Sequence, residues 1–150
     1  MRKSILFIIF FLLMCVAYFG YIHFTAADLP TFGLNLSGEK GKIKNLTKNF
    51  LEAIKFKNNE AIKSFIASDT PAEELNNFFK KTFDMSYEEI NLEKFSIEEI
   101  EIDSSKTRCK IKINITGTNQ ITKEPFTKIR VLYWYLDLKA WLIDIKNIVI

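Results

Sequence analysis

The most prominent pattern in the chain is an unbroken apolar run near the N-terminus. Residues 4–24 contain no Asp, Glu, Lys or Arg, and Arg2 and Lys3 precede them. A helix needs about 20 apolar residues to cross a bilayer core, whereas the apolar part of a cleaved signal peptide has about 7 to 15. The pattern predicts an uncleaved signal anchor over residues 1–24, a single transmembrane helix. Because the positive charges precede it, we expect a cytoplasmic N-terminus and an extracytoplasmic C-terminal domain, in the periplasm or at the cell surface.

Two alternative fates of this segment stay open. The small residues Thr25-Ala26-Ala27 are compatible with a signal peptidase site, which would release a secreted domain. Leu12-Leu13-Met14-Cys15 resembles a lipobox, in which Cys15 would carry lipid. However, Met14 stands where a small residue is usual, and the apolar run continues beyond Cys15.

Helical periodicity begins after a segment rich in Gly and Pro. Residues 25–41 show no sustained apolar period, so we expect a linker there and a folded domain over residues 42–150. Apolar residues then recur at the spacing of amphipathic helices. Thr70 and Glu73 predict a capping box around Pro71 at the start of the third helix. The predicted core positions are Ile43, Leu46, Phe50, Leu51 and Ile54 in the first helix, Ala61, Ile62, Phe65 and Ile66 in the second, and Leu75, Phe78, Phe79 and Phe83 in the third.

After about Tyr87 the period changes to two, which is typical of strands. The apolar alternation at Phe95 and Ile97 resumes at Ile100 after one extra residue, which predicts a β-bulge at Glu98-Glu99. The next strand alternates Cys109, Ile111, Ile113 and Ile115 with basic and polar residues. If Ser104-Ser105 is the turn, the pairs across the two strands are Glu101 with Arg108, Ile100 with Cys109, Glu99 with Lys110, and Ile97 with Ile111.

Two more strands are predicted from about residue 126 to 138 and from 141 to 150, joined by residues 137–140. Residues 131–136 (VLYWYL) are apolar on both faces, which is typical of a strand that is covered on both sides. The helices would form one cover. The linker, a loop or a second copy of the chain would form the other.

These elements predict an α+β fold: an N-terminal transmembrane helix, then about three helices packed on a curved antiparallel sheet of four or slightly more strands. Phe50-Leu51-Glu52-Ala53-Ile54 with Asn58-Asn59-Glu60-Ala61-Ile62, and the closing Lys139-Ala140-Trp141-Leu142-Ile143, resemble motifs of the nuclear transport factor two and ketosteroid isomerase-like superfamily, whose fold is cystatin-like. The resemblance covers about residues 42–150. It implies a conical half-barrel with a pocket between the long helix and the sheet, often as a dimer.

Composition and charge limit the classes of partner and cofactor that we expect. The chain is 48% hydrophobic and 26% charged, which indicates a folded protein, and its richness in Lys, Asn, Ile and Phe is typical of some bacteria. Arg2 and Lys3 supply two of the net three positive charges, so the exported part is nearly neutral and no nucleic-acid partner is expected. The single His is His23, in the anchor, so no metal site or other cofactor is predicted. Cys109 alternates with isoleucines, which predicts a buried apolar side chain.

The residues favour a membrane-tethered binding or interaction module without catalytic residues. Its occupant would be an envelope protein partner, a second copy of the chain or a small apolar ligand. An isomerase- or hydratase-like enzyme is the alternative, with Asp144 as base and Tyr133 or Tyr135 as the polarising donor in an apolar pocket. A part in the assembly of a larger envelope complex is a third possibility. The candidate binding residues are the aromatic side chains Phe50, Phe79, Tyr133, Tyr135 and Trp141.

Overall fold

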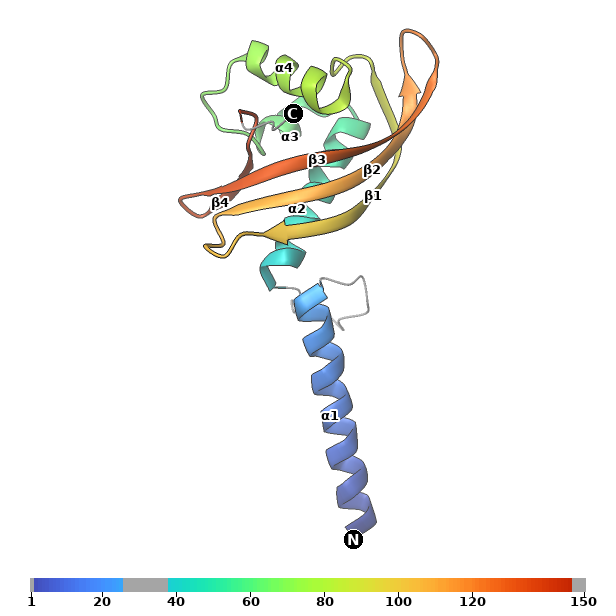
Figure 1. Ribbon diagram of the computed structural model, residues 1–150, viewed down its shortest axis with the longest axis vertical. Coiled ribbons are helices and arrows are strands. Elements are labelled where there is room, and N and C mark those ends of the chain that lie inside the picture. Colours follow the sequence, from blue (N-terminus) through green and yellow to red (C-terminus); the bar gives the residue numbers. More distant parts are fainter. Residues whose placement is uncertain (1, 26–37, 147–150) are drawn as a thin grey trace. The chain divides into compact units, whose positions relative to one another are not determined.

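The computed structural model describes residues 2–25 and 38–146 of the chain, and the side chains of α1 from residue 8 to 21 (Figure 1). Within these ranges, four helices and a four-stranded antiparallel sheet confirm the predicted α+β class. The chain divides into two compact units, Met1–Leu46 and Thr47–Ile150. The elements are α1 (Arg2–Thr25), α2 (Gly38–Lys55), α3 (Asn59–Lys63), α4 (Ala72–Phe83), β1 (Ile90–Ile102), β2 (Arg108–Asn119), β3 (Pro125–Asp137) and β4 (Ala140–Ile143).

The helix α1 is 24 residues long and carries apolar side chains exposed to solvent, among them Phe10 and Leu13, each 63% exposed. Among the described residues, no helix has both the length and the apolar character that crossing a membrane requires. Residues 26–37, most of the expected linker, lie outside the described residues. The next helix begins at Gly38, before the predicted domain start at Lys42.

The apolar stripe of α2 behaves largely as its spacing predicts. Phe50, Leu51 and Ile54 are buried, while Leu46 is only half-buried. The short helix α3 begins after Asn58, whose side-chain oxygen accepts the backbone N–H of Ala61 at 3.0 Å. An N-cap of this kind satisfies a donor that the first helical turn leaves open, so this residue sets where α3 starts.

The capping box predicted at the start of α4 is wrong. Pro71 itself is the N-cap, in an extended conformation, and no side chain caps the helix. Thr70 lies one residue before the cap, so it does not occupy the position from which a capping side chain acts. Of the predicted core residues, Phe78, Phe79 and Phe83 are buried, whereas Leu75 is half-buried.

The sheet has the order β1-β2-β3-β4, so strands that follow one another in the sequence also lie side by side in the sheet (Figure 1). The predicted bulge is confirmed, because the β1–β2 register shifts between Ile97 and Glu99. A second shift, between Leu92 and Lys94, was not predicted. It lies near Gly117 of β2, where an added Cβ would come within 2.1 Å of the Asn91 carbonyl oxygen. Only glycine allows the two backbones to approach this closely.

The predicted β1–β2 register is wrong by two residues. Glu101 lies opposite Lys110 instead of Arg108, Ile100 opposite Ile111, Glu99 opposite Lys112 and Ile97 opposite Ile113. Ser104-Ser105 does not form a two-residue turn. The loop instead runs from Asp103 to Thr107, with Lys106 at a φ of 56° and the Asp103 carboxylate accepting hydrogen bonds from loop atoms.

The core of the second unit lies on one face of the sheet. Cys109 and the alternating isoleucines of β2 are buried there, as predicted, beside Leu132 and Trp134 of β3. Phe50 packs edge to face against Trp134, with ring centroids 6.4 Å apart, and also against Phe65 and Phe78. These aromatic contacts join α2, α4 and the segment after α3 to the sheet.

The opposite face of β3 is less covered than predicted. Val131, Tyr133 and Tyr135 are half-buried, and Ile129 is 51% exposed. The apolar run therefore buries one face completely and the other only in part. β4 ends at Ile143, earlier than the predicted strand end, and residues 147–150 lie outside the described residues.

Candidate functional site

The five predicted binding residues separate into two groups. Phe50, Phe79 and Trp141 are at most 4% exposed. Phe79 stacks on Phe83, with centroids 5.7 Å apart. Large rings that point into the core are covered by their neighbours, so Phe50 of α2, Phe79 of α4 and Trp141 of β4 pack in the core. Tyr133 and Tyr135 remain half-buried and line cavities.

Two cavities share a boundary at the end of the sheet where β2 begins and β3 ends. The first measures about 500 Å³ and the second about 470 Å³. Arg108 and Asp144 line both. The first is completed by Ile66, Ala67, Asp69, Thr70, Thr107, Tyr135, Leu136, Ile143, Ile145 and Lys146, and the second by Glu101, Ile102, Asp103, Cys109, Lys110, Tyr133 and Trp134.

Strand register brings the shared residues together. Arg108 lies opposite Tyr135, and Lys110 lies opposite Tyr133. Beyond the end of β4, the Asp144 backbone N–H donates to the Tyr133 carbonyl oxygen at 2.8 Å. Residues that pair directly in an antiparallel sheet project from the same face. Arg108, Lys110, Tyr133, Tyr135 and Asp144 therefore belong to the half-covered face of the sheet.

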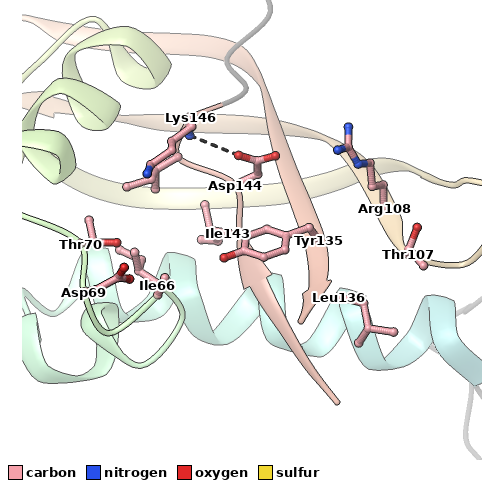
Figure 2. Close-up of a pocket in the computed structure, with 12 residues that line it drawn as sticks. Ile66, Asp69, Thr70, Thr107, Arg108, Tyr135, Leu136, Ile143, Asp144 and Lys146 are labelled. Atoms are coloured by element: carbon pink, nitrogen blue, oxygen red, sulfur yellow. Dashed lines mark hydrogen bonds between the residues drawn. The ribbon is translucent and has the colours of Figure 1, made fainter. Parts of the chain in front are cut away.

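The loop between α3 and α4 closes the first cavity. The Ile143 backbone N–H donates to the Phe65 carbonyl oxygen at 2.8 Å, which holds this loop against the free edge of β4. Figure 2 shows the result: Ile66, Asp69 and Thr70 lie on one side of the Tyr135 ring, and Thr107 and Arg108 lie on the other. No residue of α2 lines either cavity.

The pocket that the resemblance implies would lie between the long helix and the sheet. In the structure Phe50 of α2 is fully buried and packs on Trp134 in this layer. The cavities therefore lie at the sheet end and not beneath α2.

The charge around Tyr135 is mainly negative. Burial raises the pKa of the Tyr135 hydroxyl, and the carboxylates of Asp137, Asp144 and Asp69 raise it further. This hydroxyl therefore remains protonated at neutral pH and can donate a hydrogen bond. The Asp144 carboxylate accepts the backbone N–H of Lys146 at 3.2 Å, the dashed line in Figure 2.

In the second cavity, the Asp103 carboxylate accepts several hydrogen bonds from the loop between β1 and β2. Hydrogen bonds from the Ser105 hydroxyl and from the backbone N–H groups of Arg108 and Thr107 lower its pKa to about 2. Asp103 is thus an anion across the physiological pH range. Its interactions belong to the loop, so it shapes the cavity wall.

Sequence reasoning named Tyr133, Tyr135 and Asp144 but missed Arg108 and Asp69. Arg108 begins β2 and lies opposite Tyr135. A correct β2–β3 register would therefore have placed it on the same sheet face as the tyrosines. Asp69 carried no such signal, since it lies in a loop far from β3 in sequence. Within the described ranges, no three His, Cys, Asp or Glu side chains come close enough to hold a metal ion.

No protein-family model matches the chain, and no curated protein resembles it in sequence. The similarity to the nuclear transport factor two and ketosteroid isomerase-like superfamily stays a prediction that rests on short motifs. The chemistry of the two cavities is consequently the main guide to function.

Proposed function

We propose that this protein is a membrane-tethered, extracytoplasmic binding module of the nuclear transport factor two-like class, held by residues 4–24 and without catalytic activity. The observation that carries the binding role is the pair of adjoining cavities that share Arg108 and Asp144. Concave sites with a few convergent polar groups on apolar walls are where proteins take small ligands or partner side chains.

The tether is supported by the charge-free run of residues 4–24 after Arg2 and Lys3, and by the exposed apolar side chains of α1. A sequence run of about 20 apolar residues has, as a helix, the length of a bilayer core. The basic residues before this run favour a cytoplasmic N-terminus.

The tether is tested by thiol labelling in intact bacterial cells that produce the full chain. In a background with Cys15→Ser and Cys109→Ala, the exposed loop variant Ser104→Cys should react with a membrane-impermeant maleimide. The matched variant Ser4→Cys should react only after the membrane is permeabilised. Labelling of Ser104→Cys only after permeabilisation would place the domain in the cytoplasm and refute the topology.

The binding role is tested by nuclear magnetic resonance of the ¹⁵N-labelled full chain in uncharged maltoside micelles, against a library of small fragments. Binders should shift the amide signals of residues that line the cavities, Thr107 and Asp144 among them. Arg108→Gln should weaken these shifts, whereas Lys94→Gln, an exposed site on β1, should leave them unchanged. If no fragment perturbs the cavity residues, the binding role is wrong.

An enzyme is the second candidate, because Asp144 and Tyr135 line the same cavity. A carboxylate base beside a protonated tyrosine hydroxyl is the minimum that proton transfer next to a carbonyl requires. The binding role is favoured because Asp144 is half-buried and already accepts a backbone hydrogen bond from Lys146. Turnover of any bound fragment that Asp144→Asn abolishes would instead establish catalysis.

A further inference from the structure

Charges of both signs line the first cavity. Asp69 and Thr70, from the loop after α3, stand on one side of Tyr135, where Lys146 also lies, and Arg108 with Thr107, from the start of β2, stands on the other (Figure 2). Among the described residues, the ion pairs of this unit do not include the side chains of Asp69 or Arg108. Both charges are therefore available to a ligand.

An apolar surface connects the two charged ends. Ile66, Leu136, Ile143 and Ile145 line the same cavity, together with the ring of Tyr135. A volume of about 500 Å³ falls within the range of small-molecule sites in proteins. The cavity thus suits an elongated ligand with an apolar middle and a charge at each end.

The acidic end is suited to an ammonium group. Figure 2 shows the Tyr135 hydroxyl directed toward the side where Ile66 and Asp69 lie. The carboxylates of Asp137, Asp144 and Asp69 all act electrostatically on this hydroxyl. An ammonium group on this side would be attracted by Asp69 and Asp144, which line the cavity, and could lie against the tyrosine ring.

The basic end is suited to a carboxylate. The guanidinium of Arg108 presents paired N–H donors, whose geometry matches the two oxygens of a carboxylate. The Thr107 hydroxyl lies beside it in the cavity wall. A short peptide with free termini carries an ammonium and a carboxylate at opposite ends, and apolar side chains can lie between them.

We propose that the first cavity binds short apolar peptides by both free termini, with the N-terminal ammonium at Asp69 and the C-terminal carboxylate at Arg108. This inference rests on the proposed binding function and gives it a ligand class. An α-amino acid carries both charged groups on the same carbon, so they cannot lie on opposite sides of the Tyr135 ring. A wholly apolar ligand would make no use of the charges of Asp69 and Arg108.

The test uses the full chain in uncharged maltoside micelles, which carry no zwitterionic headgroup, and isothermal titration calorimetry. The probes are trileucine, N-acetyltrileucine, trileucine amide, the doubly capped tripeptide, leucine and phosphoethanolamine. Trileucine should bind most tightly. Each cap should weaken binding by about ten- to a hundredfold, the usual effect of removing one charged hydrogen-bonding group.

Variants assign each terminus to its partner. Asp69→Asn should weaken trileucine but leave the affinity of N-acetyltrileucine unchanged, because the cap has already removed the ammonium. Arg108→Gln should weaken trileucine but leave trileucine amide unchanged. Glu124→Gln and Lys94→Gln remove one charge each at exposed sites outside the cavities. They should leave the affinity for trileucine and for both of its capped forms unchanged. Thermal unfolding of every variant confirms that it folds.

The other outcomes overturn the inference. Equal affinity for free and doubly capped tripeptide would show that the termini are not recognised. Binding of phosphoethanolamine in preference to trileucine would assign the charges to a lipid headgroup, and preference for leucine would assign them to free amino acids. If no probe binds while fragments still shift the amide signals of Thr107 and Asp144, the proposed ligand class is wrong and the binding role stands. If no fragment shifts these signals either, both the ligand class and the binding role are wrong.

Discussion

The carboxylate of Asp103 accepts the backbone N–H of Arg108 across the loop between β1 and β2, with 3.0 Å between Asp103 Oδ1 and Arg108 N. The same oxygen accepts the Thr107 N–H at 2.8 Å. This side chain therefore adds two hydrogen bonds to those that the loop makes through its backbone, from Asp103 N–H to the Arg108 carbonyl oxygen and from Lys106 N–H to the Asp103 carbonyl oxygen. It also holds the first residue of β2 at the wall that the two cavities share.

Asp103→Ala is expected to lower the stability of the domain in a pH-dependent manner. Folding lowers the pKa of Asp103 from 3.8 to about 2, so its ionised form stabilises the folded state above about pH 4. This contribution is lost as the pH falls through about 2. The midpoint of thermal unfolding, followed by circular dichroism, should thus be lower than wild type at pH 6 and converge with it near pH 2.

The matched control for this loop is Ser104→Ala, an exposed neighbour, which should follow the wild-type profile throughout. A constant difference between Asp103→Ala and wild type from pH 6 to pH 2 would mean that the carboxylate charge is not what stabilises the loop.

Gly117→Ala is expected to destabilise the sheet. The new Cβ would lie 2.1 Å from the Asn91 carbonyl oxygen and 2.9 Å from the Phe126 ring, so the backbone of β1 or β2 must move. Overpacking of this kind costs about 1 to 3 kcal/mol or more. Urea unfolding should show a lower midpoint, whereas Ser96→Ala, an exposed site on β1, should change it little. An unchanged midpoint for Gly117→Ala would mean that the strands do not approach as described.

Leu138→Gly is expected to stabilise the protein. Leu138 is 95% exposed and has a φ of 51° in the turn between β3 and β4. A left-handed conformation costs about 1 to 2 kcal/mol for a residue with a Cβ, which exceeds the cost of about 0.4 to 1 kcal/mol for the freedom that glycine adds to the unfolded chain, and no buried contact is lost. We expect the unfolding midpoint to rise by about 2 to 4 °C.

Lys139→Gly, at the next position of the same turn, is the control, because its φ is not positive and glycine there only adds freedom to the unfolded chain. It should lower the midpoint. Equal effects of the two substitutions would rule out backbone strain at Leu138 as the cause.

The β1–β2 register shows where sequence reasoning reaches its limit. In β1 and β2, charged and apolar residues alternate, and this pattern predicted that acidic residues of β1 face basic residues of β2 and that isoleucines face apolar partners. Because side chains repeat every two residues along a strand, a shift of two keeps both conditions satisfied. The choice between Arg108 and Lys110 as partner of Glu101 was therefore made by the loop, through Asp103 and the left-handed Lys106.

For the cavity residues too, strand alternation predicts some positions and tertiary contacts decide the others. Tyr133 and Tyr135 share a strand face by simple alternation, so the sequence placed them together. Asp69 joins Tyr135 only because the Ile143 N–H bonds to the Phe65 carbonyl oxygen and fixes the loop after α3. Phe50, Phe79 and Trp141 were predicted as binding residues and are buried in the structure. An aromatic side chain gives the same signal in the sequence whether it packs in a core or lines a site.

Periodicity by itself determined the helices of the domain, the long strands, the bulge after Ile97 and the burial of Cys109, because these follow from which side of an element must leave water. Tertiary structure alone decided the β1–β2 register, the cap of α4 and the place of the cavities. Each of these depends on contacts between segments distant in sequence, or on backbone conformations at single residues, that local pattern does not encode.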